Sequence, residues 1–172
     1  RALDMLASAA VIAAEDTRSM RRLLDIHGVK LGGRPLVSYH DHSGDRGREA
    51  LLSHLRAGRS VAYASEAGTP LIADPGFHLS REVASAGLSV TAAPGPSATL
   101  TALTVAALPP HAFFFPAFLP TGPAARPRAS PVLRAISRTL AFSETPPRTG
   151  PLLTSPRHHS ARSLTAASAP HG

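Results

Sequence analysis

The feature that most constrains the fold is an alternation of apolar runs and helical patterns, which recurs four times before residue 109. Each apolar run is short, ends in a polar or Gly/Pro-rich joint, and is followed by apolar residues at helical spacing. Such alternation is typical of a parallel sheet covered by helices, so we expect an α/β fold. The expected strands are AAVIAA (9–14), RPLVSY (34–39), RSVAYAS (59–65) and LSVTAA (88–93). The expected helices cover residues 1–9, 17–28, 43–58, 76–87 and 94–108.

Residues at the ends of these helical patterns have the chemistry of helix caps. Thr17 is a candidate cap for the first complete helix and Gly28 a candidate stop. Gly58 and Gly87 close the next two patterns, and Pro96 suits the start of the last one. These signals leave the polar joints at the carboxyl ends of the expected strands.

Charge and proline are distributed unevenly, which sets the expected domain organisation. The net charge is +7 at pH 7, but residues 1–108 hold 11 Lys and Arg against 10 Asp and Glu, whereas residues 109–172 hold 7 against 1 and 12 of the 17 prolines. From Thr149 onward no hydrophobic period remains, which is typical of a disordered, basic segment that binds polyanions without selecting among them. We expect an α/β domain (1–118), a linker (119–130), the start of a second α/β domain (131–148) and a disordered tail (149–172).

Two absences narrow the class of protein. The chain has no cysteine, which excludes disulfides and thiolate metal sites. Its longest apolar stretches, TALTVAAL and AFFFPAFL, are far shorter than the roughly 20 residues that cross a bilayer, and no secretion signal opens the chain. We expect a cytoplasmic protein with no membrane partner.

Ligands of parallel sheets bind outside the carboxyl ends of the strands. Because the expected strands are parallel, the joints that follow them should meet at one edge of the sheet. The chain has no Walker-type phosphate loop and no G-x-G-x-x-G pattern, so triphosphate hydrolysis and a dinucleotide site are not favoured. The four joints are EDTR (15–18), HDH (40–42), SEAGTPLIADPG (65–76) and PGPSA (94–98).

The four joints, taken in chain order together with two later segments, resemble a known family. The segments AAEDTR, SYHDH, SEAGTPLIADPG, PGPSA with the following helix, F…FLP and TLAFSETPPR are similar to the ribosomal RNA small-subunit methyltransferase I family, over residues 1 to 148. The resemblance implies the tetrapyrrole-methylase fold and S-adenosylmethionine as methyl donor. It also implies the ribose 2′-oxygen of a cytidine in small-subunit rRNA as acceptor, the ribosomal subunit as partner, and a homodimer.

The chain departs from the family pattern at several positions. Glu66 stands where the family usually has Asp, Ser43 and Gly44 follow the HDH motif, and Pro147 replaces the usual histidine. The family's opening strand and its PIGN loop are missing, and its second domain would continue beyond Arg148. We therefore expect a fragment that is truncated at both ends.

The joint at 65–76 is the strongest candidate for a cofactor site. Gly68 lets the backbone approach a ligand closely, and exposed N–H and C=O groups in such a turn recognise a ligand without charged side chains. A rigid strand-to-helix turn with Pro75 at the helix start is the alternative. Ser97 and Ala98 leave room for an adenine or methionyl group, although an ordinary capped helix start explains them equally well. The resemblance implies cofactor contacts from Ser65, Glu66, Gly68, Thr69, Pro70, Ile72, Pro94, Gly95, Ser97 and Ala98.

Charged residues crowd the first joint. Asp16 and Thr17 have the usual chemistry of a solvated helix cap. As functional groups, Glu15 and Asp16 would hold ribose hydroxyls or accept the 2′-proton, and Arg18 would hold a phosphate. We expect these residues to face the RNA ribose.

The second joint admits a metal or a substrate. His40, Asp41 and His42, with Asp45 nearby, have the residue types of a metal site, but strand spacing puts only the two histidines on one side. Histidines at such an edge also hydrogen-bond substrates. We expect substrate positioning and no metal.

The expected function is thus S-adenosylmethionine-dependent 2′-O-methylation of small-subunit rRNA. Three alternatives stay open: a metal-dependent hydrolase built on the second joint, a porphyrin-type methyltransferase of the same fold, and a non-catalytic remnant that binds RNA through its basic tail. The AEDTR and HDH motifs favour the RNA branch over the porphyrin branch. The catalytic candidates are Glu15, Asp16, Arg18, His40, Asp41 and His42.

Overall fold

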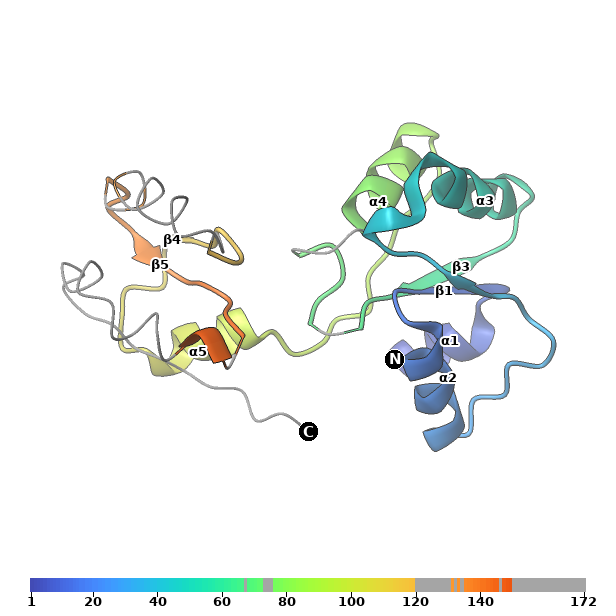
Figure 1. The fold of residues 1–172 in the computed structure, drawn as a ribbon, viewed down its shortest axis with the longest axis horizontal. Helices are drawn as coiled ribbons and strands as arrows, with labels where there is room; N and C mark the ends of the chain where they lie inside the picture. The colour runs from blue at the N-terminus through green and yellow to red at the C-terminus, as the bar shows by residue number, and fades with distance from the viewer. Residues whose placement is uncertain are drawn as a thin grey trace. The chain divides into compact units, whose positions relative to one another are not determined.

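The computed structural model of the chain divides into two units, Arg1–Pro96 and Ser97–Gly172 (Figure 1). The domain boundaries expected at residues 118 and 130 stay predictions, and most of the expected linker and nearly all of the expected tail lie outside the described residues. The residues that the structure describes are 1–66, 68–72, 76–119, 131, 133, 135–145 and 147–149.

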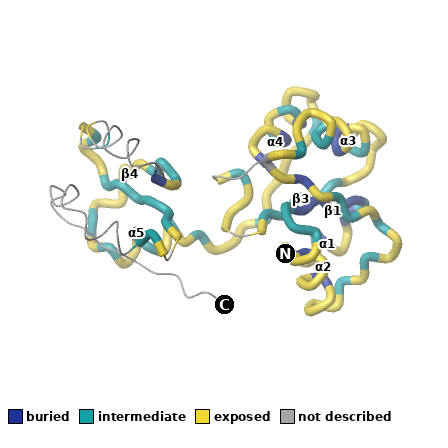
Figure 2. Tube along the Cα trace, in the orientation of Figure 1, coloured by how far each residue is buried: buried dark blue, intermediate teal, exposed yellow. Residues whose placement is uncertain are grey.

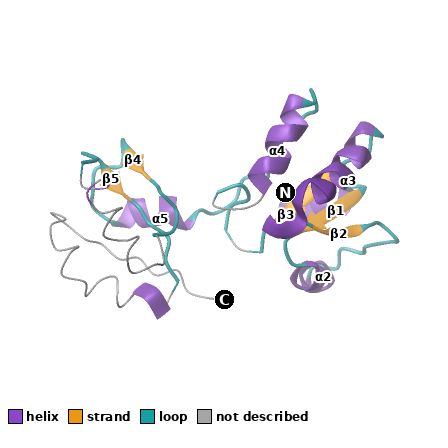
Figure 3. Ribbon diagram, turned by 45° about the horizontal axis from the view of Figure 1, so that its top comes forward, coloured by secondary structure: helices purple, strands orange, loops and turns teal. Residues whose placement is uncertain are grey.

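The first unit is built on a parallel sheet of three strands in the order β2-β1-β3 (Figure 3). The central strand β1 (Val11–Ala14) pairs with β2 (Leu36–Ser38) on one side and with β3 (Val61–Ala64) on the other. Ala14 lies opposite Ser38 and Ala64, so all three strands end at one level. The expected α/β fold with a parallel sheet is confirmed.

The prediction of a fourth strand, LSVTAA (88–93), was wrong. Residues 88–97 adopt no regular structure. Only Leu88 packs against the core, whereas Val90 is 51% exposed. An apolar run becomes a strand only where its side chains pack against a surface and its backbone pairs with another strand. In this run, Leu88 alone packs against such a surface.

β1 is buried along its whole length (Figure 2), and alternate residues of the strand face the two sides of the sheet. Val11 and Ala13 face a cluster that includes side chains of α3 (Gly44–Arg56) and α4 (Gly76–Ser85). Ile12 and Ala14 face a second cluster, with α1 (Ala2–Ser8) and α2 (Thr17–Ile26). The helices therefore form one layer on each face of the sheet (Figure 1). The helical side chains of the two clusters are Leu51, Leu52, Leu79 and Val83 in the first and Leu6, Met20 and Leu24 in the second.

The helix caps differ from the expected ones at two positions. Asp16, not Thr17, is the N-cap of α2, because its carboxylate accepts the backbone N–H of Arg18 at 2.8 Å. Ser97 is the N-cap of α5 (Ala98–Val105), so Pro96 precedes the cap and does not occupy the first helical turn. Gly28 follows α2 with φ of 65°, a conformation that glycine adopts without a steric penalty, as expected for a helix stop.

Arg34 ties the end of α1 to the segment that enters β2. Its guanidinium donates to the carbonyl oxygens of Leu6, Ala7 and Ala9, at 2.7, 3.1 and 2.8 Å. It also donates to the carbonyl oxygens of Lys30 and Leu31. The planar guanidinium thus satisfies carbonyl groups at the end of a helix, where a positive charge also interacts favourably with the helix dipole.

The second unit contains α5 and two short strands, β4 (Phe113–Phe114) and β5 (Thr139–Leu140), which pair in parallel. A further parallel bridge joins Phe118 and Ser143. Arg148 donates to the carbonyl oxygen of Leu119 and forms an ion pair with Glu144, both at 2.9 Å. Both strands are only two residues long. Among the described helices, none has the length and apolar character that crossing a membrane requires.

Replacing Arg34 by methionine should lower the free energy of unfolding of the first unit by about 2 kcal/mol, because the carbonyl groups lose a charged donor while the aliphatic stem is kept. Arg59, which is exposed, supplies the matched control. Arg59→Met should change the same quantity by less than about 0.5 kcal/mol. Urea unfolding followed by circular dichroism measures both variants, and equal losses would contradict the role given to Arg34.

The cap at Asp16 should make the stability of α2 depend on pH. The backbone N–H of Arg18 lowers the pKa of Asp16 below its ordinary value of 3.8; desolvation opposes this effect and a hydrogen bond from Ser19 adds to it. Because the folded-state pKa is depressed, the stabilisation is fully present above the ordinary value and is lost as the pH falls through the lowered one. Thermal melts of the unaltered chain and of Asp16→Asn should therefore differ in their pH dependence between about pH 5 and pH 2. Parallel curves for the two proteins would show that the carboxylate charge contributes nothing to the cap.

Candidate functional site

Three of the four polar joints meet at the carboxyl edge of the sheet. Residue 15 follows β1, residues 39–43 follow β2, and residues 65–72 follow β3. Backbone hydrogen bonds hold these ends together: the N–H of Tyr39 donates to the carbonyl oxygen of Ala14 at 2.9 Å, and the N–H of Glu15 donates to that of Ala64 at 3.2 Å. The expected convergence is confirmed for these three joints.

The fourth joint is divided between the two units. Pro94 and Gly95 are exposed and lie in the irregular segment that ends the first unit. Ser97 and Ala98 begin the second unit, where the hydroxyl of Ser97 accepts the N–H of Leu100 at 3.4 Å. The cofactor roles expected for these four residues stay predictions.

The charged residues of the first joint have separate partners. The half-buried Glu15 accepts the backbone N–H of Glu66 through Oε2 at 3.1 Å. Asp16 caps α2 and also accepts the hydroxyl of Ser19 at 3.1 Å. The side chain of Arg18 is 94% exposed, with its Nε 3.8 Å from a carboxylate oxygen of Asp16. Such an exposed pair contributes little energy, so Arg18 keeps its capacity to bind an anion.

The loop after β3 holds two residues in the left-handed region of the backbone map. Gly68 has φ of 76° and Leu71 has φ of 73°, which is strained for a leucine. The N–H of Ile72 donates to the carbonyl oxygen of Thr69 at 3.2 Å and closes the turn. Thr69, Pro70 and Ile72 are exposed. The loop thus presents backbone polar groups beside an exposed apolar side chain, a combination that fits a ligand with an amino-acid part and an apolar part.

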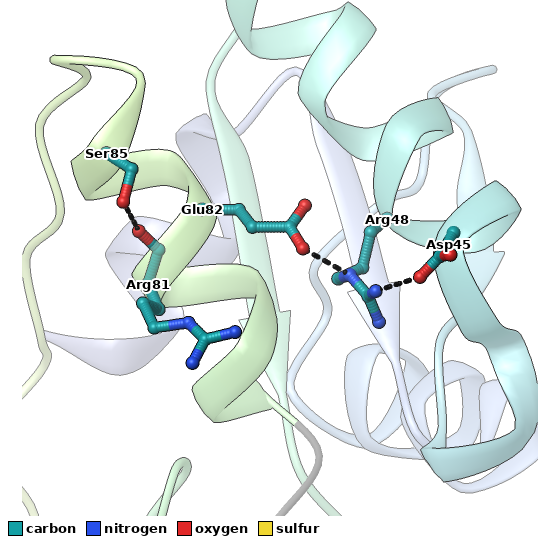
Figure 4. Close-up of polar contacts among 5 residues, drawn as sticks. All are labelled: Asp45, Arg48, Arg81, Glu82 and Ser85. Atoms are coloured by element: carbon teal, nitrogen blue, oxygen red, sulfur yellow. Dashed lines mark hydrogen bonds and ion pairs between the residues drawn. The ribbon is translucent and has the colours of Figure 1, made fainter.

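Helix α4, which follows this loop, is tied to α3 by Arg48 (Figure 4). The guanidinium donates to Glu82 of α4 at 2.8 Å and also contacts Asp45 in the first turn of α3. Within α4, the hydroxyl of Ser85 donates to the carbonyl oxygen of Arg81 at 2.8 Å. The sequence analysis missed the connection between the two helices, because Glu82 lies 34 residues from Arg48. The spacing of three residues between Asp45 and Arg48 was a visible signal for the pair within α3 alone.

The histidine joint forms a closed turn before α3. His40 caps a short 3-10 helix (Asp41–Ser43): its Nδ1 accepts the N–H of His42 at 3.2 Å, and its own N–H donates to Oγ of Ser43 at 2.9 Å. Gly47 of α3 packs closely here, because a Cβ at that position would lie 2.7 Å from Cβ of Ser43. Both histidines are exposed, and their rings stand 6.0 Å apart.

This geometry leaves Nε2 of His40 and the imidazole of His42 accessible to a ligand. Within the described part of the chain, no group of three His, Asp or Glu side chains lies close enough to hold a metal ion. The side chain of Asp41 is not described. The metal-dependent hydrolase considered from the sequence therefore receives no support.

A row of arginines extends from the first joint along α2. Arg18, Arg21 and Arg22 are exposed, and residues three and four apart lie on one side of a helix. Asp25 shares this side and reduces the local charge. The sequence analysis singled out Arg18 alone and missed the row, although the spacing was visible in the sequence.

Comparison with known proteins gives the family of this chain. The model of the tetrapyrrole (corrin/porphyrin) methylases matches residues 1–170. A similar relative is the protein named ribosomal RNA small subunit methyltransferase I from Mesorhizobium japonicum, which is 44% identical over 86% of this chain and 49% of its own length. The protein of the same name from Xylella fastidiosa is 44% identical over 90% of this chain and 55% of its own length. The protein of that name from Escherichia coli O157:H7 is 43% identical over 84% of this chain and 49% of its own length.

The chain spans about half the length of the curated relatives it matches. These matches confirm the resemblance seen in the six sequence segments. The parallel sheet with helices on both faces agrees with the same assignment. The chain belongs to the tetrapyrrole (corrin/porphyrin) methylase family.

Proposed function

We propose that this chain binds S-adenosylmethionine and contributes to methyl transfer onto small-subunit ribosomal RNA, at the ribose 2′-oxygen of a cytidine. The observation that carries the proposal is the meeting of the EDTR joint (15–18), the HDH joint (40–42) and the described part of the 65–76 joint at the carboxyl edge of the sheet. That edge is where ligands of such sheets bind, and the relatives described above carry the name of rRNA methyltransferases.

The loop at 65–72 is the proposed cofactor contact. Gly68, Thr69 and Pro70 offer backbone groups, and Ile72, which is 56% exposed, offers an apolar surface. S-adenosylmethionine would supply a methyl group bound to a sulfonium sulfur, and the neutral thioether that remains after transfer is a good leaving group. The chain therefore has to bind and align the reactants and does not need to generate a strong nucleophile. Ser65 and Glu66 stay in the proposed set as neighbours of this turn.

The two exposed histidines are proposed to position the RNA ribose. Nδ1 of His40 is occupied by the N–H of His42, so the proton of the neutral ring lies on Nε2, which is placed to donate to a substrate oxygen. His42 is exposed beside it and is suited to receive the proton that the 2′-hydroxyl must lose. Asp41 stays in the proposed set by its place in the motif.

The arginine row on α2 is the proposed contact with RNA phosphates. Arg18 lies at the functional edge, and Arg21 and Arg22 continue the row away from it. Exposed guanidiniums bind phosphate oxygens in pairs of hydrogen bonds and fix an RNA without reading its sequence. A homodimer, implied by the family resemblance, stays a prediction.

Calorimetric titration of S-adenosylmethionine into the chain should show saturable binding that EDTA does not change. Gly68→Ala should weaken this binding by about tenfold or more, because φ of 76° at the proposed contact is unfavourable for alanine. Gly87→Ala is the matched control: Gly87 has φ of 72°, and a Cβ at either glycine meets nothing within 4 Å. The control should lose similar stability and keep its affinity.

Transfer of labelled methyl groups to small ribosomal subunits, followed by digestion to nucleosides, tests the reaction itself. The expected product is 2′-O-methylcytidine. Failure of the unaltered chain to bind S-adenosylmethionine would contradict the cofactor assignment, and label in a base instead of a ribose would contradict the acceptor.

Binding of a single-stranded RNA oligonucleotide should depend on the arginine row. In the double variant Arg21→Gln/Arg22→Gln, the slope of log affinity against log salt should become shallower by about 0.7 for each phosphate of the single strand that the variant no longer binds. Lys30→Gln/Arg59→Gln removes the same charge from exposed positions that precede β2 and β3, at the opposite edge of the sheet. This control should change the slope less, as measured by fluorescence anisotropy. Equal slopes in both variants, with binding abolished by deletion of residues 149–172, would instead support the basic tail as the RNA-binding element.

A further inference from the structure

Glu15 occupies the point at which the paired strands separate. Beyond the Ala14 and Ala64 pair, β1 leads into α2 and β3 leads into the loop at 65–72. The backbone N–H of Glu15 still donates to the carbonyl oxygen of Ala64, at 3.2 Å. Its side chain then reaches the N–H of Glu66, at 3.1 Å, beyond the end of the strand ladder.

Between described residues, the other hydrogen bonds of this loop are internal. Ser65 donates from its hydroxyl to the carbonyl oxygen of Gly68 at 3.4 Å, and Ile72 donates from its N–H to the carbonyl oxygen of Thr69 at 3.2 Å. Among the hydrogen bonds between described residues, the bond from the N–H of Glu66 to the carboxylate of Glu15 is therefore the one that joins the loop to another segment. Gly68 and Leu71 both have positive φ, so the chain turns sharply within the loop. The direction in which this turn projects then follows from the position of the residues that enter it.

The carboxylate of Glu15 has no competing cation in the described part of the chain, where no Lys, Arg or His forms an ion pair with it. Its interaction with Glu66 is a charge-assisted hydrogen bond to a backbone N–H, which is stronger than a bond between neutral groups. Glu66 is exposed, so breaking this bond would leave an N–H that water solvates. The consequence would be a displaced loop and not a collapsed core.

We propose that Glu15 is a positioning residue, which holds the loop at 65–72 in the shape that binds the cofactor. This inference rests on the proposed function. It differs from the role expected from the sequence, in which Glu15 faces the RNA ribose and accepts its proton. In the arrangement proposed here, the side chain of Glu15 acts on the cofactor through the backbone of Glu66.

The test combines a measurement of the loop with a measurement of the ligand. Amide hydrogen exchange followed by NMR should show a protected Glu66 N–H in the unaltered chain, and Glu15→Ala should speed its exchange by about tenfold or more. Glu15→Gln keeps an acceptor oxygen and should stay within about threefold of the unaltered chain. Calorimetry should show weaker S-adenosylmethionine binding for Glu15→Ala, by about tenfold, and near-normal binding for Glu15→Gln. Glu49→Gln, an exposed carboxylate on α3, controls for loss of charge and should change neither quantity.

The outcomes separate this proposal from the proposed function. Unchanged Glu66 exchange in Glu15→Ala would overturn the positioning role. Loss of methyl transfer in both Glu15 variants, with S-adenosylmethionine affinity and Glu66 exchange unchanged, would also overturn it and place Glu15 at the RNA. Absence of binding by the unaltered chain would overturn the proposed function and the cofactor part of this proposal, while the exchange rates would still decide whether Glu15 holds the loop.

Discussion

Burial of β1 on both faces is the constraint on which the first unit depends. Val11, Ile12 and Ala13 are completely inaccessible, and Ala14 is 1% exposed. A strand buried in this way has no place for a polar side chain, and its alanines allow the helices to pack closely. The first polar residue, Glu15, therefore appears where burial ends, which is also where the carboxyl edge begins. Core and candidate site are thus consecutive parts of a single short segment.

The order of the strands gives this edge the topology at which parallel sheets bind ligands. With β2 and β3 on opposite sides of β1, the chain leaves β1 through α2 on one face of the sheet, whereas β3 continues through the loop at 65–72 to α4 on the other face. Connections that leave neighbouring strands toward opposite faces create the opening in which ligands of parallel sheets bind. Near this edge, Arg48 holds α4 to α3 and the carboxylate of Glu15 accepts the N–H of Glu66 in the loop, so the segments that follow β2 and β3 are fixed by polar contacts.

The sequence predicted those parts of the structure that depend on local pattern. Three strands, the helices between them and the meeting of their polar joints followed from apolar periodicity and from the glycines at helix ends. LSVTAA failed because its pattern could not reveal that most of its side chains would find no surface to cover. The contacts of Arg34, Arg48 and Glu15 lay beyond prediction for another reason: their partners are up to 28, 34 and 51 residues away, so only the folded chain brings the atoms together.

The adjacent charged residues of the EDTR motif have different partners: two accept backbone N–H groups, and the third is largely exposed. Asp16 accepts an N–H group at the start of α2, and Glu15 accepts an N–H from a different strand end, so both carboxylates are occupied by backbone donors. Arg18 is held only by a weak, exposed pair and continues into the arginine row. A carboxylate that already accepts a backbone N–H is a poor choice of general base, because taking a proton would weaken the bond that orders its partner. Under the proposed function, the proton of a ribose hydroxyl is better assigned to the exposed histidine joint. The contribution proposed for the EDTR motif is then to hold the loop through Glu15, to cap α2 through Asp16 and to bind a phosphate through Arg18.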